Sequence, residues 1–129
     1  MHQRPDPLDL LDAVAVFLRE QALPQLPPHA ADNARGAANA LDIVRRQLQL
    51  APEAEAEEQR RLRKLLQCEG SLAELNQQLC ERIADGTVSF DTPDLLQHLW
   101  RTTLDKLAVD QPGYDSYRRE SVADEETKA

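Results

Sequence analysis

One histidine stands among charged residues that could support acid-base chemistry. His98 follows Asp94 by four residues and precedes Arg101 by three, so a helix would place them on one polar face, which Asp105 extends. A carboxylate at this spacing could orient the imidazole as in general-base sites. Acid-histidine pairs at this spacing are also common on solvated helix faces, and no serine or cysteine stands at a recognisable nucleophile elbow. We predict no catalytic residue, and an enzyme using His98 ranks third among the functional hypotheses.

The acidic residues and the glycines form no recognisable metal or cofactor site. A di-metal site in a helical bundle needs inward carboxylates with Glu-x-x-His pairs, and that spacing does not occur in this sequence. The densest acidic run, 53–58, spreads its glutamates around a helix, and the four glycines are isolated, so there is no phosphate-binding loop. The sequence predicts no metal and no cofactor.

A polar helix face offers the candidate binding residues. Arg35, Asn39, Asp42 and Arg46 recur at intervals of four and three residues along the helix expected at about 29–50. The opposite seam is apolar and is expected to face a core; it consists of Ala30, Ala34, Ala37, Leu41, Val44 and Leu48. A solvated face is the default interpretation, and these four residues are the candidates for contact with a partner or ligand.

Two amides interrupt apolar surfaces. Asn33 lies near the alanine-lined seam, and Asn76 lies among leucines on a later helix. A buried amide without a partner costs about 1 to 3 kcal/mol, so both should be hydrogen-bonded. Structural pairing is the leading interpretation. Asn33 is also a candidate for partner or ligand contact.

The elements that would position these residues are all helical. Twenty leucines and seventeen alanines favour helices over strands, and apolar periodicity places helices at about 7–22, 29–50, 53–67, 71–85 and 92–109. Pro52 is expected to end the second helix, and Ser71 with Glu74 forms a capping box for the fourth. We therefore predict an all-α, single-domain antiparallel bundle of about five helices over residues 1–117, followed by a disordered tail over 118–129.

Charge and thiol content limit the partners and the compartment. The 15 Lys and Arg against 23 Asp and Glu give a net charge of -8, which repels nucleic acid and anionic membranes. The N-terminal stretch has neither a signal-peptide core nor a spanning segment, and Cys68 and Cys80 stand outside any CxxC pattern. The sequence predicts a cytoplasmic protein with reduced thiols that binds neither nucleic acid nor a membrane.

Three stretches in order resemble a bacterial family of small helical proteins that is filed as a domain of unknown function. They are RPDPLDLLDAVAVFL at 4–18, ARGAANALDIVRRQL at 34–48 and LDKLAVDQPGY at 104–114. The resemblance spans about residues 4–117. Arg35 and Asn39 match the family pattern, whereas Asn33 stands where histidine is usual and Gly36 where a larger aliphatic residue is usual.

The resemblance implies an accessory role. Members of that family accompany an aminoglycoside-phosphotransferase-like kinase and an acyl-CoA dehydrogenase-like enzyme, and include the small subunit of the levulinate-pathway 4-hydroxyacyl-CoA kinase. The expected function is therefore that of a non-catalytic interaction subunit, with phosphoryl transfer performed by the kinase-like chain. A small helical module that binds an acyl or acyl-CoA ligand is the alternative, and association with further copies of the chain is compatible with both.

Overall fold

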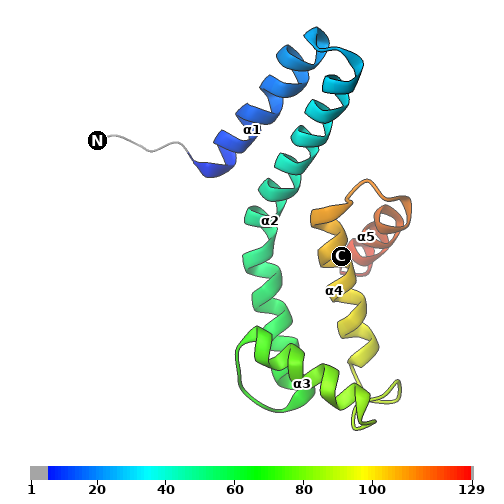
Figure 1. Cartoon of the computed structure of the whole chain (residues 1–129). Helices are drawn as coiled ribbons and strands as arrows, with labels where there is room; N and C mark the ends of the chain where they lie inside the picture. Colours follow the sequence, from blue (N-terminus) through cyan, green and yellow to red (C-terminus); the bar gives the residue numbers. More distant parts are fainter. Residues whose placement is uncertain (1–5, 129) are drawn as a thin grey trace. The chain divides into compact units, whose positions relative to one another are not determined.

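The computed structural model describes residues 6–128, with side chains described as far as Ala123. Within that range the chain consists of helices and their connections, with no strand, which confirms the all-α prediction (Figure 1). The elements are α1 (Pro7–Phe17), the π-helix η1 (Leu18–Ala22), the 3₁₀ turn η2 (Leu23–Gln25), α2 (Pro28–Leu66), α3 (Leu72–Ala84), α4 (Leu95–Asp110) and α5 (Asp115–Lys128).

The chain divides into two compact units. Unit 1 is Met1–Leu50 and contains α1, η1, η2 and the first part of α2. Unit 2 is Ala51–Ala129 and contains the rest of α2 with α3, α4 and α5. The sequence predicts one domain over 1–117. The boundary between the two units falls after Leu50, inside α2.

Unit 1 is a pair of helices with small residues at their contact. Asp6 caps α1 by accepting a 2.9 Å hydrogen bond from the backbone amide of Leu8. After the turn formed by η1 and η2, the first part of α2 runs back beside α1 (Figure 1). The buried side chains of the unit are Ala15, Ala34 and Ala38. Alanines at the contact let two helix backbones approach closely.

Pro52 lies inside α2, which continues without a break from Pro28 to Leu66. The prediction that Pro52 ends this helix and that a separate one covers 53–67 is therefore wrong. A proline removes one intrahelical hydrogen bond and crowds the carbonyl four residues earlier, but it does not prevent the flanking turns from forming. Pro52 is exposed and lies two residues beyond the boundary between the units.

The core of unit 2 is a leucine cluster. It joins the end of α2, α3, the following loop and the start of α4 through Leu62, Leu66, Leu75, Leu79, Val88 and Leu95. The predicted capping box of α3 is present, because the Ser71 hydroxyl accepts from the Glu74 amide and the Glu74 carboxylate accepts from the Ser71 amide. Arg82 also donates to the Leu66 carbonyl at 2.9 Å, which fixes α3 to the end of α2.

Helix α4 begins at Leu95, three residues later than the predicted start at 92. Residues before it form turns: the Thr92 hydroxyl accepts from the Ser89 amide, and Asp94 adopts a left-handed backbone with φ of 72°. Aspartate tolerates this conformation better than most residues. This turn directs the chain into α4 and places the Asp94 side chain at the edge of unit 2.

Helix α5 occupies the segment for which the sequence predicts a disordered tail from residue 118. Local hydrogen bonds support this helix, including Arg118 N to the Tyr114 carbonyl at 2.9 Å and the Arg119 guanidinium to the Ser116 hydroxyl at 3.3 Å. The prediction of a disordered tail rested on the scarcity of apolar side chains after residue 118, which leaves α5 with little apolar surface to bury.

Candidate functional site

Part of the predicted polar face of α2 takes part in the contact with the end of α1. Arg19, in the π-helix η1, donates to Asn39 Oδ1 at 3.0 Å and to Asp42 Oδ2 at 2.6 Å. Arg45 also lies near Asp42, with Nη2 3.7 Å from Oδ1. The hydrogen bond from Arg19 is the main reason that the pKa of Asp42 lies below its usual value. Asn39 and Asp42 therefore have a structural role within unit 1.

The other predicted binding residues lie elsewhere. Arg35 forms an exposed ion pair with Asp32 at 2.8 Å, Asn33 is exposed, and Arg46 is half-buried. Asn33 is thus not buried in the alanine-lined contact, because the helix presents Ala34 and Ala38 there. Whether these residues bind a partner stays a prediction. The expected pairing of the second amide is present: Asn76 donates to Glu58 Oε2 at 2.9 Å.

The apolar faces of unit 1 differ most from expectation. The inward residues are Leu8, Leu11 and Ala15 on α1 and Leu18 at the start of η1. By contrast, Leu10, Val14 and Phe17 on α1 are between 48% and 53% exposed. Leu10, Val14 and Phe17 are spaced as one helical stripe, which we call the outer stripe of α1. On α2, Val44 and Leu48 are also exposed while Leu41 is half-buried, so the predicted core seam faces outward at its downstream end.

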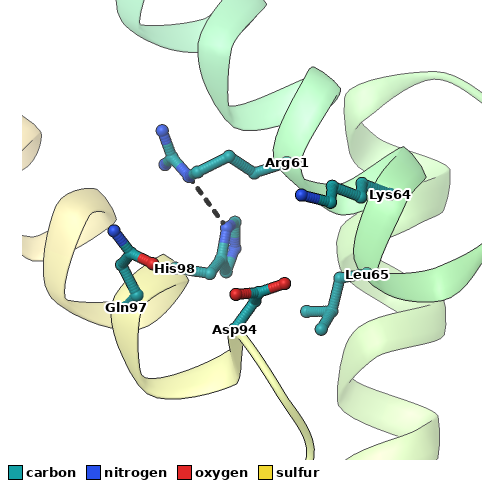
Figure 2. A pocket seen from close by; sticks show the side chains of 6 residues that line it. All are labelled: Arg61, Lys64, Leu65, Asp94, Gln97 and His98. Carbon is teal, nitrogen blue, oxygen red and sulfur yellow. Dashed lines mark hydrogen bonds between the residues drawn. The ribbon is translucent and has the colours of Figure 1, made fainter.

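His98 is buried, and a basic residue rather than an acid orients it. Its exposed fraction is 3%, and Nδ1 accepts a 3.1 Å hydrogen bond from Arg61 Nε on α2 (Figure 2). Arg61 Nη2 also donates to the Thr102 hydroxyl at 3.2 Å, so its guanidinium bridges α2 and α4. The expectation that His98 lies with Asp94 on a solvated face is wrong, because this face of α4 packs against α2.

This geometry fixes the charge and the tautomer of His98. Arg61 Nε can only donate, so Nδ1 must carry a lone pair, and the proton of the neutral ring lies on Nε2. Burial, and secondarily the charge of Arg61, lowers the pKa of His98 and keeps the ring neutral. In this form His98 can donate a hydrogen bond through Nε2, but it cannot accept a proton there.

A pocket of about 230 Å³ opens beside this histidine, entirely within unit 2. Figure 2 shows its lining, with the basic side chains coming from α2 and the polar ones from the start of α4. The lining residues are Arg61, Lys64, Leu65, Asp94, Gln97 and His98. The pocket thus combines hydrogen-bond donors from two helices with one carboxylate.

Sequence reasoning found His98 and Asp94 but missed Arg61, Lys64 and Gln97. Arg61 and Lys64 belong to a basic run that suits the dipole at the end of a helix, and 37 residues separate Arg61 from His98. No local pattern connects them. The only signal was the histidine itself, because a lone histidine on an otherwise amphipathic helix requires a partner once it is buried.

Three further properties of the described residues concern metal ligands, membrane-spanning helices and thiols. No three of its His, Cys, Asp or Glu side chains come together in a way that could hold a metal ion. None of the helices in residues 6–128 has both the length and the apolar character needed to cross a bilayer. The two cysteines are free; Cys68 is half-buried, and Cys80 is exposed.

Comparison with known proteins assigns the family. A family model described as a domain of unknown function, DUF6285, matches residues 24–114. The chain belongs to the DUF6285 family. Comparison with curated proteins and with solved structures gave no match. The DUF6285 match contains the polar face of α2 and the whole pocket around His98, and it stops just before α5; helix α1 lies outside it.

Proposed function

We propose that this DUF6285 protein is a non-catalytic subunit that binds another protein through the outer stripe of α1. The observation that carries the proposal is the exposure of Leu10, Val14 and Phe17 on a helix whose inward face is already packed. A helix with apolar residues on both sides is usually buried on both sides. Protein surfaces of this kind generally mark an interaction site.

The first part of α2 strengthens the argument. Val44 and Leu48 are 46% and 52% exposed and lie one turn apart on the same helix. The alanine-lined contact in unit 1 is closely packed, with Ala15 and Ala38 at most 1% exposed. That packing gives no support to an acyl chain between these two helices, whereas the exposed apolar side chains favour a protein partner.

The chemical character of the chain agrees with a subunit that leaves catalysis to its partner. His98 is held as a hydrogen-bond donor and not as a base. The sequence contains no recognisable catalytic triad and no glycine-rich phosphate-binding loop. From the family resemblance, we propose that the partner is a hydroxyacyl-CoA kinase of the aminoglycoside phosphotransferase type in the bacterial cytoplasm. An acyl-CoA dehydrogenase-like enzyme is a further candidate member of the assembly.

Co-expression with a kinase of the aminoglycoside phosphotransferase type, the proposed partner, followed by size-exclusion chromatography, tests the proposal. We expect the two chains to elute together, at a mass larger than that of either alone, because binding removes the outer stripe from water. Independent elution with and without ATP, magnesium and acyl-CoA would contradict the proposal. So would turnover of a hydroxyacyl-CoA by this chain alone.

A further inference from the structure

The pocket beside His98 is lined by a histidine whose Nε2 makes no hydrogen bond to a described residue. The exposed fraction of His98 is 3%, and its Nδ1 accepts the hydrogen bond from Arg61. Among the described residues, the hydrogen bonds of the His98 side chain are confined to that one nitrogen, which leaves the Nε2 proton directed at the pocket that His98 lines. Nε2–H is therefore the donor that His98 can offer to an acceptor atom of a bound ligand.

We propose that this pocket binds a small organic monocarboxylate, with one carboxylate oxygen accepting from His98 Nε2. The inference is independent of the proposed function, since it concerns unit 2 and no partner protein. A neutral imidazole fixed as a donor is suited to an anionic oxygen, because it provides a hydrogen bond without losing a proton.

Two further polar side chains line the same pocket on either side of His98. Lys64 extends from α2, and Gln97 lies on the first turn of α4 next to His98 (Figure 2). An ammonium group and a carboxamide complement the two oxygens of a carboxylate, which accept several hydrogen bonds. Charge-assisted bonds of the ammonium type are about twice as strong as neutral ones, so Lys64 should contribute most to affinity.

The charge of the lining selects a monoanion. Arg61 and Lys64 are cationic, Asp94 is anionic and His98 is neutral, so the six lining residues carry one net positive charge. The carboxylates of Glu58 and Asp105 also act on Arg61, so Lys64 is the cation that a ligand would pair with. A carboxylate neutralises that charge, whereas a phosphate dianion would leave an excess negative charge beside Asp94. Leu65 and the aliphatic stems of the basic residues provide apolar contact for a short carbon chain. The volume of about 230 Å³ restricts the ligand to a small molecule.

The experiment is an NMR titration of the ¹⁵N-labelled full chain at constant ionic strength, with sodium butyrate as the probe and inorganic phosphate and chloride as comparisons. We expect saturable shifts with butyrate at the start of α4 and at the His98 Nε2–H resonance. Lys64→Gln should weaken butyrate binding by about tenfold, the loss of one charge-assisted hydrogen bond. Lys106→Gln, an exposed change elsewhere on α4, should leave the affinity unchanged.

Several outcomes would overturn the inference. They are the absence of saturable shifts with butyrate, equal effects of the two lysine substitutions, and phosphate binding at the same resonances as tightly as butyrate. Lys64 is exposed, so K64Q is not expected to disturb folding. His98→Gln adds a second variant: it retains an acceptor for Arg61, and weaker butyrate binding with an unchanged backbone spectrum would support the role of Nε2.

Discussion

At the scale of single residues, two arginines make polar side-chain contacts between helical segments that the apolar pattern does not predict. Arg61 holds His98 as a neutral donor, and Arg19 binds two side chains on α2 from the π-helical turn after α1. Single π-helical turns occur often at functional sites. Here the turn positions Arg19, which lies 20 and 23 residues from its two partners.

His98 should make stability depend on pH. Its pKa is lowered in the folded state, mainly by burial, from an ordinary value of 6.5. Above about pH 6.5 neither state takes up the proton, and below it the unfolded chain binds a proton that the folded chain resists. The free energy of unfolding should therefore fall on acidification, by at most about 1.4 kcal/mol per pH unit from this group.

The measurement is chemical unfolding of the wild type and His98→Gln between pH 5 and 8. The difference in free energy of unfolding between the two proteins should be constant above about pH 7 and shrink below the ordinary histidine pKa. His29 is present in both proteins, so its effect cancels in the difference. A difference that does not change with pH would show that burial and Arg61 do not lower the His98 pKa.

The bond between Arg19 and Asp42 should be measurable as a coupling energy. The side chain of Asp42 is 18% exposed and that of Arg19 39%, so we expect about 1 kcal/mol from a double-mutant cycle of Arg19→Ala and Asp42→Asn. Denaturant unfolding provides the four free energies. Asp32 and Arg35, whose side chains are 77% and 54% exposed, form the control pair with a coupling near zero. Equal couplings for the two pairs would contradict the structural role of Arg19.

At the scale of elements, the sequence predicted which segments are helical better than it predicted where one helix ends and the next begins. The apolar repeats and the capping box located α3 closely, and the all-α class followed from the leucine and alanine content. Pro52 misled the prediction because proline is a strong local terminator, whereas the helix on each side is long enough to continue through it.

Replacing Pro52 by alanine should stabilise the protein by about 2 kcal/mol. Alanine restores the missing backbone donor and removes the clash with the carbonyl four residues earlier, and a proline in a helix interior costs about 3 kcal/mol relative to alanine. Pro28→Ala is the matched control, because Pro28 begins α2, where the amide needs no intrahelical partner. Thermal and denaturant unfolding measure both. A destabilised P52A, or an equal gain from P28A, would contradict this account.

The candidate site was less predictable than the elements. The polar face of α2 was visible in the sequence, but its contact with Arg19 depends on a π-helical turn that has no local signature. The outer stripe of α1 cannot be told from a core face in the sequence, because periodicity shows that a face is apolar and does not show which surface covers it. The pocket combines two segments that only the folding of unit 2 brings together.

At the scale of the whole molecule, the two units carry different properties. Unit 1 has a closely packed alanine contact and an exposed apolar surface, and unit 2 has a leucine core and a polar pocket. The DUF6285 match spans most of both units but begins after α1. The outer stripe lies on α1, outside the matched residues 24–114.

The most direct test of the interaction role is the affinity of two matched variants for the kinase-like protein, measured by isothermal titration calorimetry. Val14→Glu places a charge in the outer stripe, whereas Val16→Glu places one on the same helix outside it, at a residue of similar exposure. We predict that V16E binds like the wild type and that V14E binds at least about tenfold more weakly, with both retaining the wild-type circular dichroism. Wild-type affinity for V14E, or an equal loss for V16E, would contradict the account.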